Sequence, residues 1–273
     1  MKKLAGIILF FCLVTLGAFA HFQLIYTPES FIDEGSSLDF KIVFTHPAEA
    51  GHTMDIGKNE AGEIKGVKEF FSVHKGEKTD LLKELQKTEF TSPENTAGAY
   101  NFTLNKDNGF KGPGDWVLIL VPHPYYEAAE DKYIQQIAKV IINKGEQVTD
   151  WTERCAAGYP EIMPLVKPYD VWVGGVFRGV VLGSDGKPVP NAEIEVEYIN
   201  YNIDMKKSKF TGKAKTGKAA AVIYADANGN FSFVPTKEGY WGFAALSAGK
   251  DTQFGGKELS QDAVLWIQAS KVK

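Results

Sequence analysis

Hydrophobic and polar residues alternate with a period of two along much of this chain. The alternation is clear over residues 38–45, 100–104 and 194–198. Successive side chains of an extended strand point to opposite faces of a sheet, so this period predicts strands with one buried face. The spacing of three to four that marks an amphipathic helix is not sustained anywhere. The pattern therefore predicts an all-β fold.

Two longer segments are apolar on both faces or rich in β-branched residues. Residues 116–121, Trp-Val-Leu-Ile-Leu-Val, have no polar face and predict a strand buried between layers. Residues 133–142 are ambiguous in period, but their β-branched content favours a strand. A turn-rich stretch over residues 143–169 then separates two groups of strands, and we read it as a connection.

The short, evenly spaced strands after this connection are typical of a β-sandwich. They are joined by turns such as Gly183–Pro188 and Asp226–Asn230, a spacing found in Ig-like and prealbumin-like folds. We therefore predict two β-sandwich domains. The first is a β-rich domain over residues 21–168. The second is an Ig-like or prealbumin-like sandwich over residues 169–273.

The N-terminus has the three parts of a secretory signal peptide. Met1-Lys2-Lys3 is basic, residues 4–19 are apolar, and Ala18 and Ala20 are the small residues of a cleavage site. Cleavage after Ala20 would remove residues 1–20 and make His21 the new N-terminus. We expect export to the periplasm.

Composition and charge narrow the possible partners. The 44% hydrophobic and 12% aromatic content indicates a folded globular protein rather than a disordered one. The whole chain carries a net charge of −4, which argues against a nucleic-acid partner because such proteins present a basic face. No segment after the signal peptide reaches the roughly 18 apolar residues of a membrane span. We expect at most peripheral membrane contact. The lysine-rich loop over residues 206–218 is first of all a solvated loop, and contact with anionic lipid headgroups is the alternative.

The histidines are the main candidates for chemistry. All five precede residue 124, and each is predicted at a strand end or in an adjoining loop. A histidine at a free N-terminus offers its α-amino nitrogen and its imidazole to one ion, and imidazole suits Ni²⁺, Co²⁺, Cu²⁺ and Zn²⁺. Strand-end residues that are distant in sequence can converge in loops at one end of a sandwich. The predicted metal ligands are His21, His46, His52 and His123, and the domain over residues 21–168 is therefore the predicted metal-binding domain.

Each histidine also has a simpler interpretation. His46 continues an apolar face and could be a hydrogen-bonded core residue, while His123 lies between two prolines and could mark a rigid strand exit. His74 precedes a charged turn and is not included in the predicted site.

Signatures of enzymes are missing. The chain contains no G-x-S-x-G nucleophile elbow and no G-x-x-x-x-G-K-[ST] phosphate loop. Cys155 is the one cysteine left after removal of the signal peptide, and nothing near it in sequence suggests a nucleophile. We expect a protein that is not an enzyme and has no catalytic residues.

Several short motifs resemble those of a known family. They run in order along nearly the whole mature chain: Phe44-Thr45-His46-Pro47, residues 74–81, Pro113-Gly114-Asp115-Trp116, Pro124-Tyr125-Tyr126-Glu127, residues 161–165, Gly186-Lys187-Pro188-Val189, and Asp226-Ala227-Asn228-Gly229 with residues 239–243. The chain resembles the periplasmic component associated with ABC-type cobalt/nickel transport systems, a group often described only as a domain of unknown function. In that pattern a histidine directly after the signal peptide corresponds to His21, and the His-Pro pair corresponds to His46 and Pro47.

The resemblance implies a periplasmic protein that captures Ni²⁺ or Co²⁺ as bound cargo. Its expected partners are inner-membrane components of a metal transporter. His52 and His123 match no motif of the family, and their assignment depends on the argument from residue type alone.

Two other classes of function remain open. A terminal histidine and a second histidine on a β-sandwich also describe copper-binding histidine-brace proteins, some of which are oxidative enzymes that attack polysaccharides. The third class is a carbohydrate- or protein-binding sandwich whose histidines are incidental, and it predicts no metal binding.

Overall fold

The structure is a computed structural model that describes residues 21–35 and 37–271. The predicted signal peptide lies outside the described residues. Within them the chain forms strands throughout, together with one 3₁₀ turn at η1 (Leu82–Glu84) and no α-helix. The predicted all-β fold is therefore confirmed, and its strands pack as sandwich layers.

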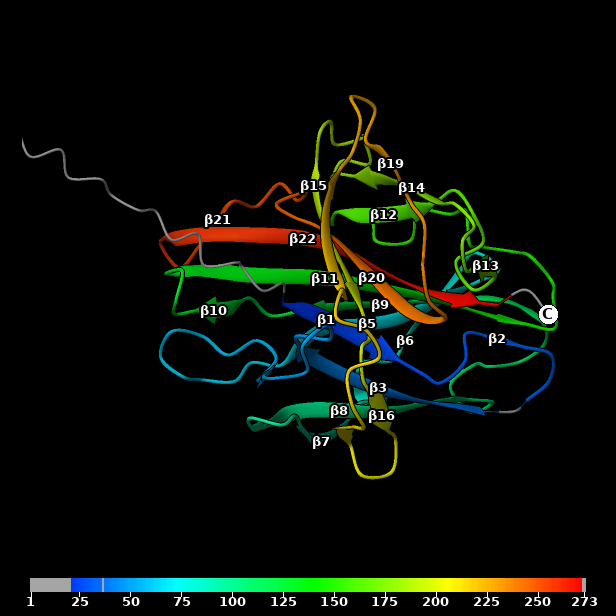
Figure 1. Cartoon of the computed structure of the whole chain (residues 1–273), viewed down its shortest axis with the longest axis horizontal. Helices are drawn as coiled ribbons and strands as arrows, with labels where there is room; N and C mark the ends of the chain where they lie inside the picture. The colour runs from blue at the N-terminus through cyan, green and yellow to red at the C-terminus, as the bar shows by residue number, and fades with distance from the viewer. Residues whose placement is uncertain (1–20, 36, 272–273) are drawn as a thin grey trace, which may run out of the picture.

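The largest sheet runs through the middle of the molecule (Figure 1). Its main path, in spatial order, is β18 (Ala220–Tyr224), β15 (Glu193–Tyr198), β20 (Gly239–Ala245), β22 (Lys257–Ser270), β11 (Lys132–Lys144), β9 (Gly114–Pro122), β5 (Val67–His74) and β6 (Glu77–Asp80). Four short strands pair beside this path: β2 (Phe31–Ile32), β10 (Tyr125–Glu127), β13 (Val171–Trp172) and β21 (Gln253–Phe254).

Two smaller sheets complete the described strands. The seven-stranded sheet consists of β1 (Phe22–Tyr26), β3 (Ser37–Thr45), β8 (Thr96–Asn105), β7 (Gln86–Thr91), β17 (Lys209–Thr211), β16 (Asn202–Asp204) and β4 (Thr53–Met54). The three-stranded sheet consists of β12 (Glu161–Pro164), β14 (Phe177–Leu182) and β19 (Asn230–Phe233). Figure 1 shows these two sheets on opposite sides of β22 and β11.

Successive side chains of β22 point to opposite faces of the sheet, so this one strand contributes to two hydrophobic cores. Val264 and Trp266 belong to the hydrophobic cluster shared with Phe22, on the side of the seven-stranded sheet. Leu265 and Ile267 point the other way, into the cluster that includes Phe177 of β14. Both faces of this strand are therefore buried, which explains its nearly continuous apolar sequence.

The strand predictions hold in most particulars. Residues 38–45 lie in β3, and residues 116–121 lie in β9, every residue of which is buried. The ambiguous segment 133–142 is part of the long strand β11. The connection predicted over residues 143–169 contains β12, which pairs with β14.

The predicted division at residue 168 lies within a continuous structure. β11, before that point, pairs in parallel with β22, after it, from Tyr133↔Leu259 to Val140↔Trp266. Strands from both predicted domains thus share the central sheet. The division into residues 21–168 and 169–273 stays a prediction.

Candidate metal centre

His21 and His46 lie next to each other because of the register between β1 and β3. The two strands are antiparallel, with Phe22 opposite Thr45 and Gln23 opposite Phe44. Continuing that register by one residue places His21 opposite His46. Their ring centroids are 4.6 Å apart and the rings are nearly perpendicular, at 81°. The structure thus brings together two of the four residues predicted as ligands.

Gln136 of β11 bonds the backbone on both sides of Phe22, through the carbonyl group of His21 and the N–H of Gln23. Its side-chain Nε2 donates to the carbonyl oxygen of His21 at 2.6 Å, and its Oε1 accepts from the backbone N–H of Gln23 at 2.8 Å. Gln136 is itself buried. The residue that follows the predicted cleavage point is therefore held in place by the core of the central sheet.

Glu127 of β10 orients the ring of His21. Its Oε2 lies 2.9 Å from Nε2 of His21, and its Oε1 accepts from the backbone N–H of Ala129 at 2.9 Å. The bond to His21 is the main reason that the pKa of Glu127 is held below its usual value. With Nε2 bound to this carboxylate, Nδ1 is the ring nitrogen of His21 available to another partner.

Among the described residues, His46 has a ring nitrogen without a hydrogen-bond partner. Its Nε2 is buried and has no hydrogen-bond partner among the described residues. Burial, followed by the neighbouring His21 and His52, lowers the pKa of His46 to about 4 against the opposing effect of Glu127. A neutral imidazole has a lone pair on one nitrogen, and an unpaired buried nitrogen costs free energy unless something binds it. This is the chemistry that a metal ligand requires.

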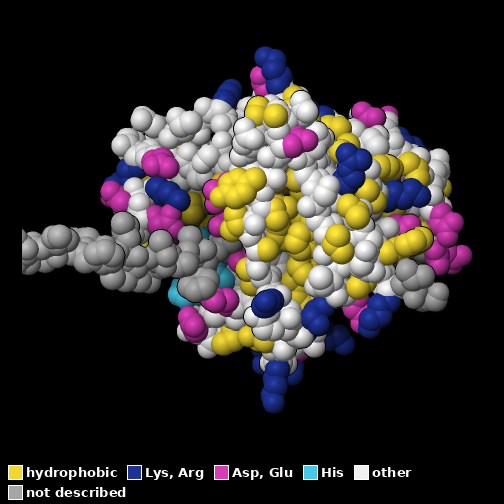
Figure 2. Space-filling view, turned by 45° about the horizontal axis from the view of Figure 1, so that its top comes forward, with side chains coloured by type: hydrophobic (Ala, Val, Ile, Leu, Met, Phe, Trp, Pro, Cys, Tyr) yellow, Lys and Arg dark blue, Asp and Glu magenta, His cyan; other side chains and the backbone are white. Residues whose placement is uncertain are grey.

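Aromatic rings enclose the pair on one side. The ring centroids of Phe44 and Tyr125 lie 5.7 and 6.1 Å from that of His21. Burial, with help from Glu127, raises the pKa of Tyr125 to about 12, so its hydroxyl stays protonated at neutral pH. Figure 2 shows histidine side chains at the surface with acidic side chains close by.

A small acidic cavity of about 130 Å³ adjoins His21. Its walls include Glu195 of β15 and Asp262 of β22. Burial raises the pKa of Asp262, and burial together with Asp262 raises the pKa of Glu195 to about 7. Both carboxyl groups therefore hold their protons to a higher pH than exposed carboxyls do, and they gain negative charge beside His21 only as the pH rises.

His52 is near the pair through its backbone. Its carbonyl oxygen accepts from the backbone N–H of His46 at 3.4 Å and from Oγ1 of Thr45 at 2.9 Å. Its side chain is 52% exposed and lies 3.8 Å from the carboxylate of Glu94. Among the ring contacts of the described residues, His52 shares none with His21 or His46.

His123 and Tyr125 line the same small space. The ring of His123 lines this space together with Gln23, Tyr125 and Gln136, and its backbone N–H donates to Gly66. Burial, followed by Lys68 and Lys65, lowers its pKa. In the part of the chain that the structure describes, no ring contact joins it to His21 or His46.

The side chains alone do not form a complete metal centre. Within residues 21–35 and 37–271, no group of three or more His, Cys, Asp and Glu residues has a geometry that could hold a metal ion. A site at His21 would need a further ligand, and the α-amino nitrogen becomes one only after cleavage at Ala20. In the uncleaved chain that nitrogen is a peptide amide. The predicted ligand set stays a prediction.

Two residues of this site were missed in the sequence. Glu127 belongs to the motif Pro124-Tyr125-Tyr126-Glu127, so a signal for it was present, but nothing linked that motif to His21. Gln136 has no such signal, because its role depends on the pairing of distant strands.

The remaining histidine and the cysteine are not part of this site. His74 stacks on Trp116, with ring centroids 3.8 Å apart, and its Nδ1 lies 2.8 Å from the carbonyl oxygen of Asp115. Burial raises the pKa of Cys155 to about 11, which disfavours a thiolate nucleophile.

Comparison with protein families gives one match, which covers residues 18–249 and is described as "Domain of unknown function (DUF4198)". The chain belongs to the DUF4198 family. The match includes His21, His46 and Glu127. No curated protein matches this DUF4198 chain.

Solved structures resemble this DUF4198 chain only weakly. The D0-D1 domain of Intimin is 11% identical with a TM-score of 0.20, over 89% of this chain and 96% of that one. The alpha-2-macroglobulin of E. coli is 10% identical with a TM-score of 0.22, over 92% of this chain but only 14% of its own length. Dimeric latent PorU from Porphyromonas gingivalis is 12% identical with a TM-score of 0.22, over 91% of this chain and 20% of that one. These likenesses carry no argument about function.

The described residues of this DUF4198 chain include no helix with the length and apolar character required to cross a membrane.

Proposed function

We propose that this chain is an exported protein that captures a divalent transition metal at His21 and His46. The observation that carries this proposal is the buried Nε2 of His46, which has no partner among the described residues and lies beside the ring of His21. After cleavage at Ala20, the ligands would be the α-amino nitrogen and Nδ1 of His21 together with Nε2 of His46. Glu127 would hold the His21 ring in the orientation that leaves Nδ1 available.

The proposed cargo is Ni²⁺ or Co²⁺. Three nitrogen ligands suit borderline metals, and a planar arrangement of nitrogens is typical of Ni²⁺ and Cu²⁺. The resemblance to periplasmic components of cobalt/nickel uptake systems favours nickel and cobalt. In this proposal the protein works in the periplasm, and an inner-membrane ABC-type transporter receives the metal. His52 and His123 would complete the ligand set only after a rearrangement of their loops.

Copper is the second candidate. Two histidines, one of them N-terminal, supply the donor set of a histidine brace, and copper leads the affinity order for such nitrogen sites. In that case the protein would be a copper-binding protein, with oxidative chemistry as one of its options. Affinity alone does not distinguish these candidates.

The test is calorimetric titration of the chain that begins at His21 with Ni²⁺, Co²⁺, Cu²⁺ and Zn²⁺ in turn. The matched control begins at Ala20, which adds one residue and converts the His21 amine into an amide. We expect one ion per chain in the first protein and a loss of affinity of at least tenfold in the control. His46→Ala should lose affinity to a similar extent.

Equal binding by the two N-termini would refute the role of the His21 amine. Absence of stoichiometric binding of any of the four ions would refute the whole proposal. If only Cu²⁺ binds, or if the copper-loaded protein consumes oxygen in the presence of a reductant, the copper candidate replaces the nickel and cobalt one.

A further inference from the structure

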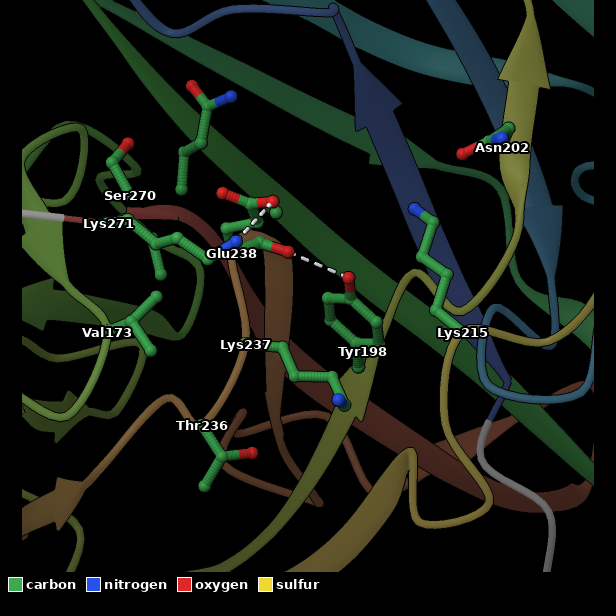
Figure 3. A pocket seen from close by; sticks show the side chains of 12 residues that line it. Val173, Tyr198, Asn202, Lys215, Thr236, Lys237, Glu238, Ser270 and Lys271 are labelled. Atoms are coloured by element: carbon green, nitrogen blue, oxygen red, sulfur yellow. Dashed lines mark hydrogen bonds and ion pairs between the residues drawn. The ribbon is translucent and has the colours of Figure 1, made fainter.

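A larger pocket lies away from the histidine pair, where the end of β22 meets the start of β20. Its volume is about 810 Å³, within the range of roughly 300–1,000 Å³ typical of small-molecule sites. Figure 3 shows side chains from several separate segments around it, including Tyr198 of β15, Lys215 of the loop before β18, and Lys271 after β22. None of the four predicted metal ligands lines this pocket.

The charge of this pocket is opposite to that of the protein. Three lysines line it, Lys215, Lys237 and Lys271, whereas the chain as a whole has a net charge of −4. The acidic residue in the lining is Glu238, which forms an ion pair with Lys271 at 3.1 Å. Lys215 and Lys237 have no carboxylate partner in the described ranges. Two of the three lysines in the pocket are therefore not in an ion pair with a carboxylate of the described residues, although Glu238 acts on Lys215 from a longer distance.

The segment that carries Lys215 is held firmly. The backbone carbonyl oxygen of the buried Asn200 accepts a hydrogen bond from the backbone N–H of Lys215 at 2.9 Å. Its side-chain amide bonds both the N–H and the carbonyl oxygen of Thr216, each at 2.9 Å. The ammonium of Lys215 lies 5.5 Å from the ring centroid of Tyr198 and donates to the carbonyl oxygen of Ile199 at 3.3 Å. Lys215 is thus positioned on the pocket wall by the loop that bears it.

Hydrogen bonds also hold the segment that carries Lys237 and Glu238. Tyr198 donates its hydroxyl to the carbonyl oxygen of Glu238 at 2.7 Å, as the dashed line in Figure 3 marks. The indole N–H of Trp241 donates to the carbonyl oxygen of Lys237 at 3.0 Å. Gly239 adopts φ +119°, and a Cβ at that position would lie 3.1 Å from the Tyr198 ring. The turn that presents Lys237 can pack this closely because residue 239 is glycine.

We propose that this pocket binds a small molecule that carries two or more carboxylate or phosphate groups. Lys215 and Lys237 would neutralise its anionic groups, and the hydroxyls of Thr236 and Ser270 could donate further hydrogen bonds to it. Preformed walls reduce the ordering that binding would otherwise require. This site is separate from the metal site, and either one can exist without the other.

The experiment follows backbone amide signals by NMR while the chain beginning at His21 is titrated with citrate, with inorganic pyrophosphate or with neutral glucose. A chelator-free, metal-free sample avoids competition from bound metal. We expect saturable shifts at Gly239 and Ser270 with citrate or pyrophosphate and none with glucose. A response to citrate alone would assign a carboxylate ligand, and a response to pyrophosphate alone a phosphate ligand.

The decisive variant is Lys215→Gln combined with Lys237→Gln, which should weaken binding at least tenfold. Its matched control is Lys106→Gln combined with Lys111→Gln, two exposed lysines outside the pocket that give the same change in net charge. If the double variant fails to fold, Lys237→Gln alone, at an exposed turn, tests the site. The proposal is overturned if neither anion gives saturable shifts, if the shifts lie elsewhere, or if the control weakens binding as much as the pocket variant.

Discussion

His21 lies directly across the β1–β3 strand pair from His46, one residue beyond the Phe22↔Thr45 pair. This position brings the rings to a centroid distance of 4.6 Å. The relationship depends on register, because a slip of one residue would turn each side chain to the opposite face of the sheet. The buried neighbours of both strands, among them Phe22 and Phe44, therefore also determine the geometry of the histidine pair.

Removing the carboxylate that orients His21 should weaken metal binding. In Glu127→Ala the ring of His21 loses the partner of its Nε2, so Nδ1 is no longer held toward the proposed metal position. Changes to residues that orient metal ligands typically cost about 10–100-fold in affinity. We expect a loss in that range by calorimetric titration. Glu84→Ala, an exposed acid that does not line the cavity beside His21, is the control, and an equal loss in both variants would mean that only net charge matters.

Replacing His46 with leucine should stabilise the metal-free protein. The buried Nε2 of His46 has no partner in the described structure, and an unsatisfied buried polar group costs about 1–3 kcal/mol. We expect His46→Leu to raise the free energy of unfolding by about 1 kcal/mol in chelator, measured by urea denaturation at pH 7.5, while abolishing metal binding.

His74→Leu is the contrasting variant. His74 stacks on Trp116 and bonds to the carbonyl oxygen of Asp115, so its loss should lower the free energy of unfolding. If His46→Leu is also destabilising, Nε2 of His46 has a partner in solution, and the argument for a metal at that position loses its main support.

The sequence was sufficient to predict the strands but not their partners. Alternation at residues 38–45 and the apolar run at 116–121 identify strands because burial acts on each residue locally. The parallel pairing of β11 with β22 joins residues more than a hundred positions apart, and no local pattern encodes it. The boundary at residue 168 was predicted from the turn-rich connection alone, because the sequence does not show that β11 and β22 pair.

The same limit applies to the candidate site. His21 and His46 could be proposed from residue type and from the predicted cleavage point. Glu127 and Gln136 could not be assigned, because each reaches His21 from a strand more than a hundred residues away. His52 was predicted from its closeness to His46 in sequence, yet its exposed ring lies beside Glu94.

The stability of the protein should fall as the pH rises through the titration of Glu195. Burial raises the folded-state pKa of Glu195 to about 7, above the value of about 4.3 expected in the unfolded chain. The folded state therefore holds this proton more tightly than the unfolded chain does. The proton's contribution to the free energy of unfolding is complete below about pH 4.3 and is lost as the pH rises through about 7.

Glu195→Gln should abolish this loss. We expect the variant to be more stable than the native protein at pH 8, by on the order of 2 kcal/mol because Glu195 is partly exposed, and nearly equal to it at pH 4. The measurement is urea denaturation across this pH range. Glu77→Gln, on the exposed edge strand β6, should show no such pH-dependent gain, and a parallel behaviour of the two variants would contradict the raised pKa.

Breaking the buried ion pair between Lys139 and Glu161 should be strongly destabilising. The two groups are 2.5 Å apart, and their side chains are 1% and 2% exposed. Lys139→Met would leave the Glu161 carboxylate buried without its counter-charge, which typically costs about 3–5 kcal/mol. Lys187→Met is the control, because Lys187 and Asp185 pair in solvent with side chains that are 82% and 59% exposed. That exposed pair should contribute at most about 1 kcal/mol.

A double variant tests the role of Glu161. Adding Glu161→Leu to Lys139→Met should recover only part of the lost stability, because Glu161 also accepts hydrogen bonds from the backbone N–H groups of Cys155 and Ala156. Equal costs for Lys139→Met and Lys187→Met in urea denaturation would show that water reaches Glu161 in solution.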